Sequence, residues 1–243
     1  SYRRYVDLQR DAMVWSVVAT PPDSMQPRTW CYPVIGCASY RGYFSKQEAQ
    51  AFGQAQREQG MEVAVEPVPA YSTLGWFDDP VTSSVVEWPE ARLAGLIFHE
   101  LAHQQLYLPG DSAFNEGFAT LVEREGVLRW LQGESNHAAL DAWWTTQDRE
   151  LSFVALLLQT RKRLGKIYQL PLTDQQKRSR KADEFRLLSE EYQNLKALWG
   201  GFDGYDAWFE HEPNNARLAS VATYEQRFPA FLMLLVRAGG EME

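Results

Sequence analysis

The chain has few of the residues that would point to several common classes of protein. Of its 243 residues, only two are cysteine and four are histidine, and its 24 basic side chains are outnumbered by 32 acidic ones. The formal net charge of −8 at pH 7 argues against nucleic acid as the main partner, because phosphate binding requires a clustered positive face. No apolar run reaches the roughly 20 residues of a membrane-spanning helix. Ser1 does not begin a signal peptide, so we expect that any export signal is not present in this sequence.

The two cysteines, Cys31 and Cys37, lie close together in an aromatic stretch. Their spacing does not suit the paired cysteines of zinc sites, and their surroundings favour a small disulfide loop formed in an oxidising compartment. The alternative is a pair of reduced, buried thiols in a cytosolic protein.

Two of the four histidines belong to one short motif, His99-Glu100-Leu101-Ala102-His103. Histidines four residues apart project from one face of a helix, where two imidazoles can chelate one Zn²⁺. A carboxylate from Glu116 on a second helix would complete a three-ligand site with one position open for water, the arrangement of a zinc hydrolase. The alternative is that both are helix-surface or satisfied core histidines.

The flanking residues predict a helix on each side of a turn. Pro89 suits a first helical turn, and Leu93, Ile97 and Leu101 recur as an apolar stripe. Pro109-Gly110-Asp111 marks the end of this helix. Glu116 lies among apolar positions of the second helix, where an unpaired carboxylate is costly and a metal ion would satisfy it. Those apolar positions are Phe114, Phe118, Leu121, Val122, Val127 and Leu128.

The motif also supplies the groups that hydrolysis needs. Zn²⁺ lowers the pKa of water and polarises a carbonyl, and Glu100, turned about 100° from His99 on the helix, is the expected general base. Each ligating imidazole needs its other N–H held, for which Glu123 and Asp111 are the candidates. The oxyanion donor is left open among three tyrosines, which are Tyr71, Tyr107 and Tyr224. The lone histidines His137 and His211 are expected to be surface or core residues.

The rest of the chain predicts an α+β fold that is mainly helical. We expect a helix over residues 2–18, a strand over 31–40, a helix from Ser45-x-x-Glu48 to Gly60, and a strand over 61–68. The last strand could be the sheet edge along which a peptide lies. Residues 70–80 form either a loop near the metal or a packed structural loop.

Residues 134–199 read as two long helices joined near Leu170-Pro171-Leu172, which predicts an antiparallel helical hairpin. Basic residues cluster at its tip. Such a cluster is usually solvated, and the less favoured interpretation is an anionic partner or membrane surface. The cluster consists of Arg161, Lys162, Arg163, Lys166, Lys177, Arg178, Arg180 and Lys181.

Several segments together resemble the bacterial predicted zinc aminopeptidase family, whose catalytic part is similar to the gluzincin metallopeptidases. The resemblance runs from Trp30 through Glu125, with a further block near the end of the chain. The matching segments are Gly36-Cys37, Tyr40 to Phe44, Ala70 to Phe77, Asp79-Pro80, His99 to His103, Gly110 to Glu125, and Asn214 to Leu218 with Tyr224 and Phe228 beyond it.

This resemblance implies a zincin fold, one Zn²⁺ per chain held by His99, His103 and Glu116, and Glu100 as the base. It also implies an envelope or periplasmic location, with membrane association through a lipid anchor absent from this sequence. Only the resemblance suggests that Asn215 faces the substrate. Two departures stand out: the spacing from His103 to the third ligand is shorter than in thermolysin-like enzymes, and Thr120 replaces an acidic residue four positions after that ligand.

The departure at Thr120 transfers the expected histidine-orienting role to Glu123. An aminopeptidase must also hold a free α-ammonium group, for which a carboxylate is the natural partner. Glu123, Asp111 and Asp79 are the candidates for that role, and the sequence does not choose among them.

The sequence therefore predicts a zinc-dependent metallopeptidase, in particular an aminopeptidase acting on peptides. Its organisation is a zincin-like catalytic lobe over residues 1–133 and a helical lobe over 134–243, or one continuous domain. The competing hypothesis is a non-catalytic interaction protein that uses the hairpin and keeps a vestigial or structural metal site. A deformylase is disfavoured because the cysteine ligand of that class has no counterpart near the helix.

Overall fold

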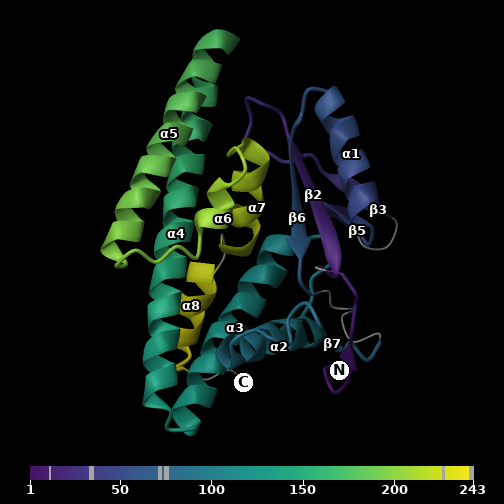
Figure 1. Cartoon of the computed structure of the whole chain (residues 1–243), viewed down its shortest axis with the longest axis vertical. Helices are drawn as coiled ribbons and strands as arrows, with labels where there is room; N and C mark the ends of the chain where they lie inside the picture. Colours follow the sequence, from purple (N-terminus) through teal and green to yellow (C-terminus); the bar gives the residue numbers. More distant parts are fainter. Residues whose placement is uncertain (11, 33–35, 71–72, 74–76, 226–227, 241–243) are drawn as a thin grey trace.

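The computed structural model describes residues 1–10, 12–32, 36–70, 73, 77–225 and 228–240. The fold is α+β and mainly helical, which confirms the predicted class. Figure 1 shows a small sheet beside α1, two crossing helices below it, and a long helical hairpin along the other side. No helix within the described ranges is both long enough and apolar enough to cross a lipid bilayer.

The main sheet has three antiparallel strands in the order β5-β2-β6, with β2 (Val14–Thr20) between β5 (Arg41–Tyr43) and β6 (Glu62–Val68). Side chains alternate between the faces of a strand, so Val17 packs against α1 (Lys46–Glu58) while Val18 packs against α7 (Asn215–Glu225). The sheet is therefore covered by a helix on each face. The predicted strand over 61–68 is confirmed as β6, which is an edge strand.

The prediction of a helix over residues 2–18 was wrong. Tyr5–Val6 form β1, which pairs in parallel with β7 (Val81–Thr82), and the central strand β2 begins at Val14. The run from Val14 to Val18 contains three valines and a tryptophan, residues that fit a pleated, half-buried surface better than a helix.

The predicted strand over 31–40 is instead two short strands, β3 (Trp30–Tyr32) and β4 (Gly36–Ala38). Cys31 and Cys37 are paired across this hairpin in register and form a disulfide, which is the first of the two alternatives from the sequence.

Capping residues, glycine and proline explain where several helices begin and end. Ser45 accepts a hydrogen bond from the backbone of Glu48 at the start of α1, and Gly60 adopts a φ of +80° just beyond its end. The histidine motif lies on α2 (Glu90–Gln105), which begins after Pro89, and Glu116 lies on α3 (Ser112–Gly133). The remaining helices are α4 (His137–Gln169), α5 (Asp174–Leu198), α6 (Asp206–Phe209) and α8 (Phe228–Arg237).

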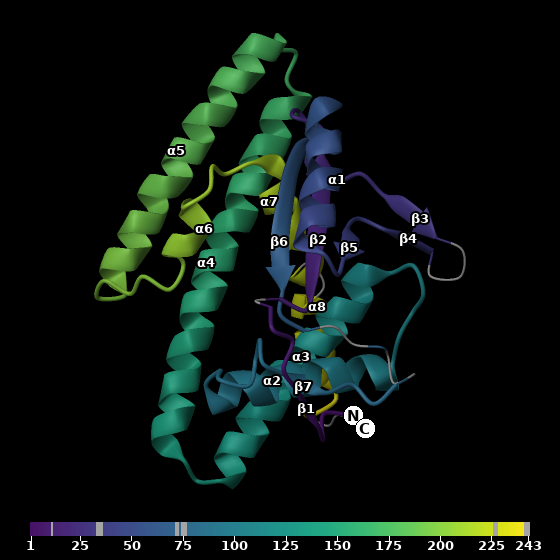
Figure 2. The ribbon, with the colours of Figure 1, turned by 45° about the vertical axis from the view of Figure 1, so that its right-hand side comes forward.

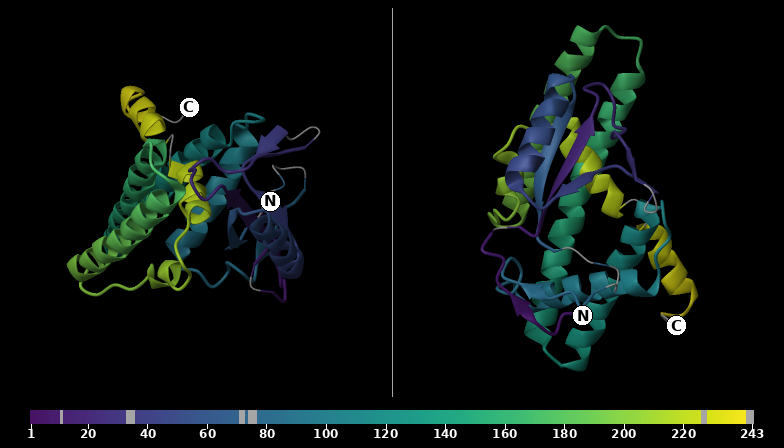
Figure 3. Two further views of the ribbon diagram at one scale, coloured as in Figure 1. Left: turned by 90° about the horizontal axis from the view of Figure 1, so that it is seen from above. Right: turned by 90° about the vertical axis from the view of Figure 1, so that its right-hand side faces the viewer.

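The predicted hairpin is confirmed as α4 and α5, whose core centres on Phe153, Leu157, Leu164, Leu188 and Tyr192. Helix α7 lies between this hairpin and the sheet, in contact with α4, β2 and β6, and also packs against α3 (Figure 3). The predicted boundary between residues 133 and 134 falls between α3 and α4, yet α7 from the second part forms one cover of the sheet from the first part.

Candidate metal centre

Helices α2 and α3 pack closely against each other because glycine occupies the points of contact. A side chain at Gly126 would begin only 2.8 Å from the ring of Phe98, and one at Gly95 would meet Glu123 at 3.2 Å. Figures 1 and 2 show the two helices crossing below the sheet. The sequence analysis did not single out these glycines, although glycine inside an amphipathic helix often marks a close approach of this kind.

This packing brings together the three side chains that the sequence proposed as metal ligands. The Nε2 atom of His99 lies 3.2 Å from Oε2 of Glu116, and Nε2 of His103 lies 3.8 Å from the same oxygen. One ligand atom from each residue lies within 4.8 Å of the other two. His103 is buried, and the side chains of His99 and Glu116 are 13% and 18% exposed.

The geometry and the chemistry of these donors fit a zinc ion. Ligand atoms bound tetrahedrally to Zn²⁺ at about 2.0–2.1 Å are separated by roughly 3.4 Å, close to both separations measured from Glu116. Two imidazoles and one carboxylate form a donor set that suits zinc. Within the described part of the chain, the buried Nδ1 atom of His103 has no hydrogen-bond partner. Of the two histidines, only His99 thus has a described hydrogen-bond partner at Nδ1, which is Glu123.

The electrostatics of the cluster also favour a cation. Burial alone would lower the pKa of His99, but its hydrogen bonds to Glu116 and Glu123, together with the charges of those carboxylates, raise the pKa from 6.5 to about 10. Burial lowers the pKa of His103. Without metal at neutral pH, His99 is thus protonated between two carboxylates and His103 is neutral. A bound metal would replace the proton of His99.

Glu123 lies on the opposite side of the His99 ring from Glu116. Its Oε2 atom is 3.0 Å from Nδ1 of His99. A carboxylate at this distance fixes the tautomer and the ring orientation of a ligating histidine. This is the role that the sequence assigned to Glu123 because Thr120, which is buried, replaces the usual acidic residue.

Asn115, the residue before the third ligand, anchors the turn between the two helices. Its side chain accepts a hydrogen bond from the backbone N–H of Leu108 at 2.8 Å and donates one to the carbonyl of Leu108 at 2.9 Å. Asp111 caps α3 by accepting from the N–H of Phe114. These contacts determine where α3 starts and therefore where Glu116 lies. No role for Asn115 was predicted from the sequence. Its position directly before the proposed ligand Glu116 could have indicated one.

The remaining candidates near the motif have different environments. Glu100 is buried on α2 directly after His99. Tyr107 is 37% exposed, and its ring centroid lies 6.4 Å from that of His103. Tyr71 and the side chain of Tyr224 lie outside the described residues. Tyr107 is thus the one of the three proposed oxyanion donors whose neighbourhood the structure describes.

Asn215, for which only the family resemblance suggested a substrate contact, makes its described contacts within the protein. It is fully buried, accepts a hydrogen bond from the hydroxyl of Tyr168, and donates to the carbonyls of Pro21, Pro22 and Ser24. These bonds connect the start of α7 to α4 and to the segment after β2. A side chain with this burial and these partners holds the hairpin against the sheet.

The other carboxylate proposed for an α-ammonium group, Asp79, is also engaged within the protein. It is buried and accepts hydrogen bonds from the backbone and the hydroxyl of Thr73.

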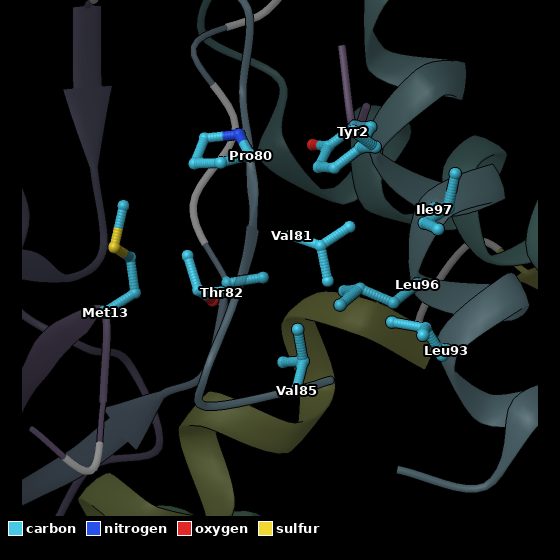
Figure 4. Close-up of a pocket in the computed structure, with 10 residues that line it drawn as sticks. Tyr2, Met13, Pro80, Val81, Thr82, Val85, Leu93, Leu96 and Ile97 are labelled. Carbon is cyan, nitrogen blue, oxygen red and sulfur yellow. The ribbon is translucent and has the colours of Figure 1, made fainter. Parts of the chain in front are cut away.

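An apolar pocket lies on the N-terminal half of α2, one turn before Glu100. Figure 4 shows side chains from this helix facing Tyr2 and the segment around Val81. Its lining is almost wholly apolar, which fits a packing role for this part of α2. The residues that line it are Tyr2, Met13, Ala70, Pro80, Val81, Thr82, Val85, Leu93, Leu96 and Ile97.

Comparison with known proteins agrees with the site geometry at the level of the family. A family model described as "Putative aminopeptidase" matches residues 1–243. No curated protein and no solved structure shows a significant match to the chain. Because the family model covers the whole sequence, the chain belongs to this aminopeptidase family.

Proposed function

We propose that this protein is a zinc-dependent aminopeptidase. The observation that carries the proposal is the cluster of His99, His103 and Glu116, whose ligand atoms lie within 4.8 Å of one another in a chain of an aminopeptidase family. A buried carboxylate, Glu100, follows the first histidine directly. Together these residues are the parts that a metal-assisted peptide hydrolysis needs.

The two chemical tasks of the reaction are divided between the metal and Glu100. When bound, zinc supplies a Lewis acid that lowers the pKa of water and polarises the carbonyl under attack. Glu100 accepts the proton of the attacking water and then donates it to the nitrogen of the leaving amine. The carboxylate therefore acts first as a base and then as an acid.

The surrounding residues orient the ligands and stabilise charge. With metal bound, a hydrogen bond from Nδ1 of His99 to Glu123 would leave Nε2, on the side of Glu116, free to bind the ion. Tyr107 borders His103, and its hydroxyl is our candidate for the donor to the oxyanion that forms as the carbonyl is attacked.

The aminopeptidase part of the proposal is supported by the family rather than by one assigned carboxylate. Glu123 bonds to His99, Asp111 caps α3 and Asp79 bonds to Thr73, so each candidate for binding an α-ammonium group already has a partner. Peptides with free and acetylated amino termini test this part directly. An aminopeptidase cleaves only the free peptides, and cleavage of both forms would show that a free amino terminus is not required.

The zinc site itself is tested by metal content. Purified wild type, Glu116→Ala and Glu100→Gln are exchanged into zinc, freed of excess metal and analysed for bound metal and peptide turnover. We expect one zinc per chain in wild type and Glu100→Gln, and a large loss in Glu116→Ala. Unchanged zinc affinity in Glu116→Ala would show that another residue is the third ligand.

The competing function is a non-catalytic interaction protein with a structural metal site. Structural zinc is usually held by four protein ligands, whereas three residues within the described ranges contribute to this cluster. Family membership also favours the peptidase. Bound zinc without hydrolysis of any peptide would support the interaction protein instead.

We further propose that the protein acts in the bacterial envelope or periplasm. The disulfide between Cys31 and Cys37 supports an oxidising compartment, where such bonds persist. Alkylation of the protein from its native cells, with and without prior reduction, tests this location. Cysteines that are alkylated without reduction would contradict it.

A further inference from the structure

The tip of the α4–α5 hairpin has the opposite charge to the rest of the molecule. Residues 161–183 contain eight of the 24 basic side chains but only two of the 32 acidic ones, which gives this segment a formal charge of +6. The remainder of the chain carries −14. The tip is therefore a positive pole on an acidic protein, and the proposed peptidase chemistry does not use it.

Part of this positive charge is neutralised by structural contacts. Arg163 forms ion pairs with Glu184 and Glu191, and Lys181 forms one with Glu62 on the sheet. Arg161 is half-buried and donates a hydrogen bond to the carbonyl of Met25. The other five form no ion pair within the described ranges, and four of them are exposed. These five are Lys162, Lys166, Lys177, Arg178 and Arg180.

The apex between these cations is apolar. Leu170 is 41% exposed, Pro171 is exposed and Leu172 is half-buried in the short connection between the helices. The capping box of Thr173 and Gln176 fixes the start of α5 directly after this connection. Exposed apolar side chains on a well-defined backbone and flanked by cations are typical of a surface that contacts lipid headgroups.

The position of the tip makes it accessible to a flat surface. Figures 1 and 2 show it at one end of the molecule, with both chain termini at the opposite end. From Lys162 to Leu170 a helix rises about 12 Å, slightly more than the screening length of about 10 Å at 0.1 M salt. The free cations farthest from the apex thus lie at about the screening length, while Lys166 and Lys177, each about one helical turn from the apex, lie well within it.

We propose that the hairpin tip docks on an anionic lipid membrane. The apex projects from one end of the molecule, so it can meet a planar partner. Nucleic acid would satisfy the cations but would leave Leu170 and Pro171 without an apolar contact. Lipid satisfies both, because headgroup phosphates pair with the cations while the apex reaches the acyl boundary.

The test measures binding of the intact protein to lipid vesicles by co-sedimentation. One vesicle is phosphatidylcholine alone, and the other contains equal amounts of phosphatidylcholine and phosphatidylglycerol. The tip variant carries Lys166→Gln, Lys177→Gln and Arg178→Gln. Its matched control carries Arg3→Gln, Arg4→Gln and Arg57→Gln, which remove the same charge from exposed positions elsewhere. Circular dichroism and thermal unfolding confirm that both variants fold.

We expect wild type and the control variant to bind anionic vesicles, and to bind less at high salt. Each basic residue at an anionic surface raises partitioning about fivefold, so the tip variant should bind roughly a hundredfold more weakly. Leu170→Ser should weaken binding on the order of fivefold. Equal losses in the tip and control variants, equal binding to neutral vesicles, or no binding to anionic vesicles would overturn the proposal. Tighter binding of a single-stranded oligonucleotide than of anionic vesicles to the same residues would overturn it in favour of nucleic acid.

Discussion

The metal-free protein should lose stability as the pH rises above neutrality. His99 has a pKa of about 10 in the folded protein and an ordinary value near 6.5 when unfolded. Because the folded value is the higher one, the stabilising contribution is fully present below pH 6.5 and disappears as the pH rises through 10.

The size of this effect follows from the shift. A difference of about 3.5 pKa units corresponds to roughly 5 kcal/mol in the free energy of unfolding at low pH. Between pH 7 and pH 9 the folded protein keeps the proton while the unfolded chain has released it, so the free energy of unfolding should fall by about 2–3 kcal/mol. Urea unfolding in the presence of a chelator, followed by circular dichroism, measures this difference.

Two variants isolate the origin of the effect. His99→Asn removes the titrating group and reports what other groups contribute between the same pH values. Glu123→Gln removes one of the two carboxylates that raise the pKa, so the loss of stability should be smaller than in wild type. A free energy of unfolding that is the same at both pH values in metal-free wild type would refute the proposed charge state of the site.

Three further variants test the parts of the site. Glu123→Gln should weaken zinc binding by about 10- to 100-fold in competition titrations with a chelating dye, and unchanged affinity would exclude an orienting role. Asn115→Ala should cost about 1–3 kcal/mol in urea unfolding, because the polar backbone of Leu108 loses both partners. Gly126→Ala should cost roughly 1–3 kcal/mol, because its Cβ would displace Phe98, and a neutral effect would show that the helices separate easily.

The local features of the site were predictable because they depend on short sequence spacings. Two histidines four residues apart must share a helix face, and Pro109-Gly110-Asp111 had to separate that helix from the one bearing Glu116. The hairpin followed equally from long apolar periodicity that a single proline-containing turn interrupts.

The features that the sequence did not reveal depend on contacts between distant segments. Residues 14–20 are the central strand because β5 and β6 pair with them on both sides. The valines of this run favour a strand locally, but the sequence does not show which segments pair with it. Asn215 shows the same limit. The family resemblance suggested a substrate contact for it, but only the tertiary structure shows that its amide bonds to three carbonyls and to Tyr168.

The most direct test of a zinc-dependent aminopeptidase with Glu100 as its general base compares peptide turnover by wild type and Glu100→Gln at equal zinc occupancy. We predict that wild type releases single residues from free amino termini and that the rate is lower by about 10²- to 10⁴-fold in the variant. Equal turnover by the two proteins, or none by zinc-loaded wild type, would contradict it.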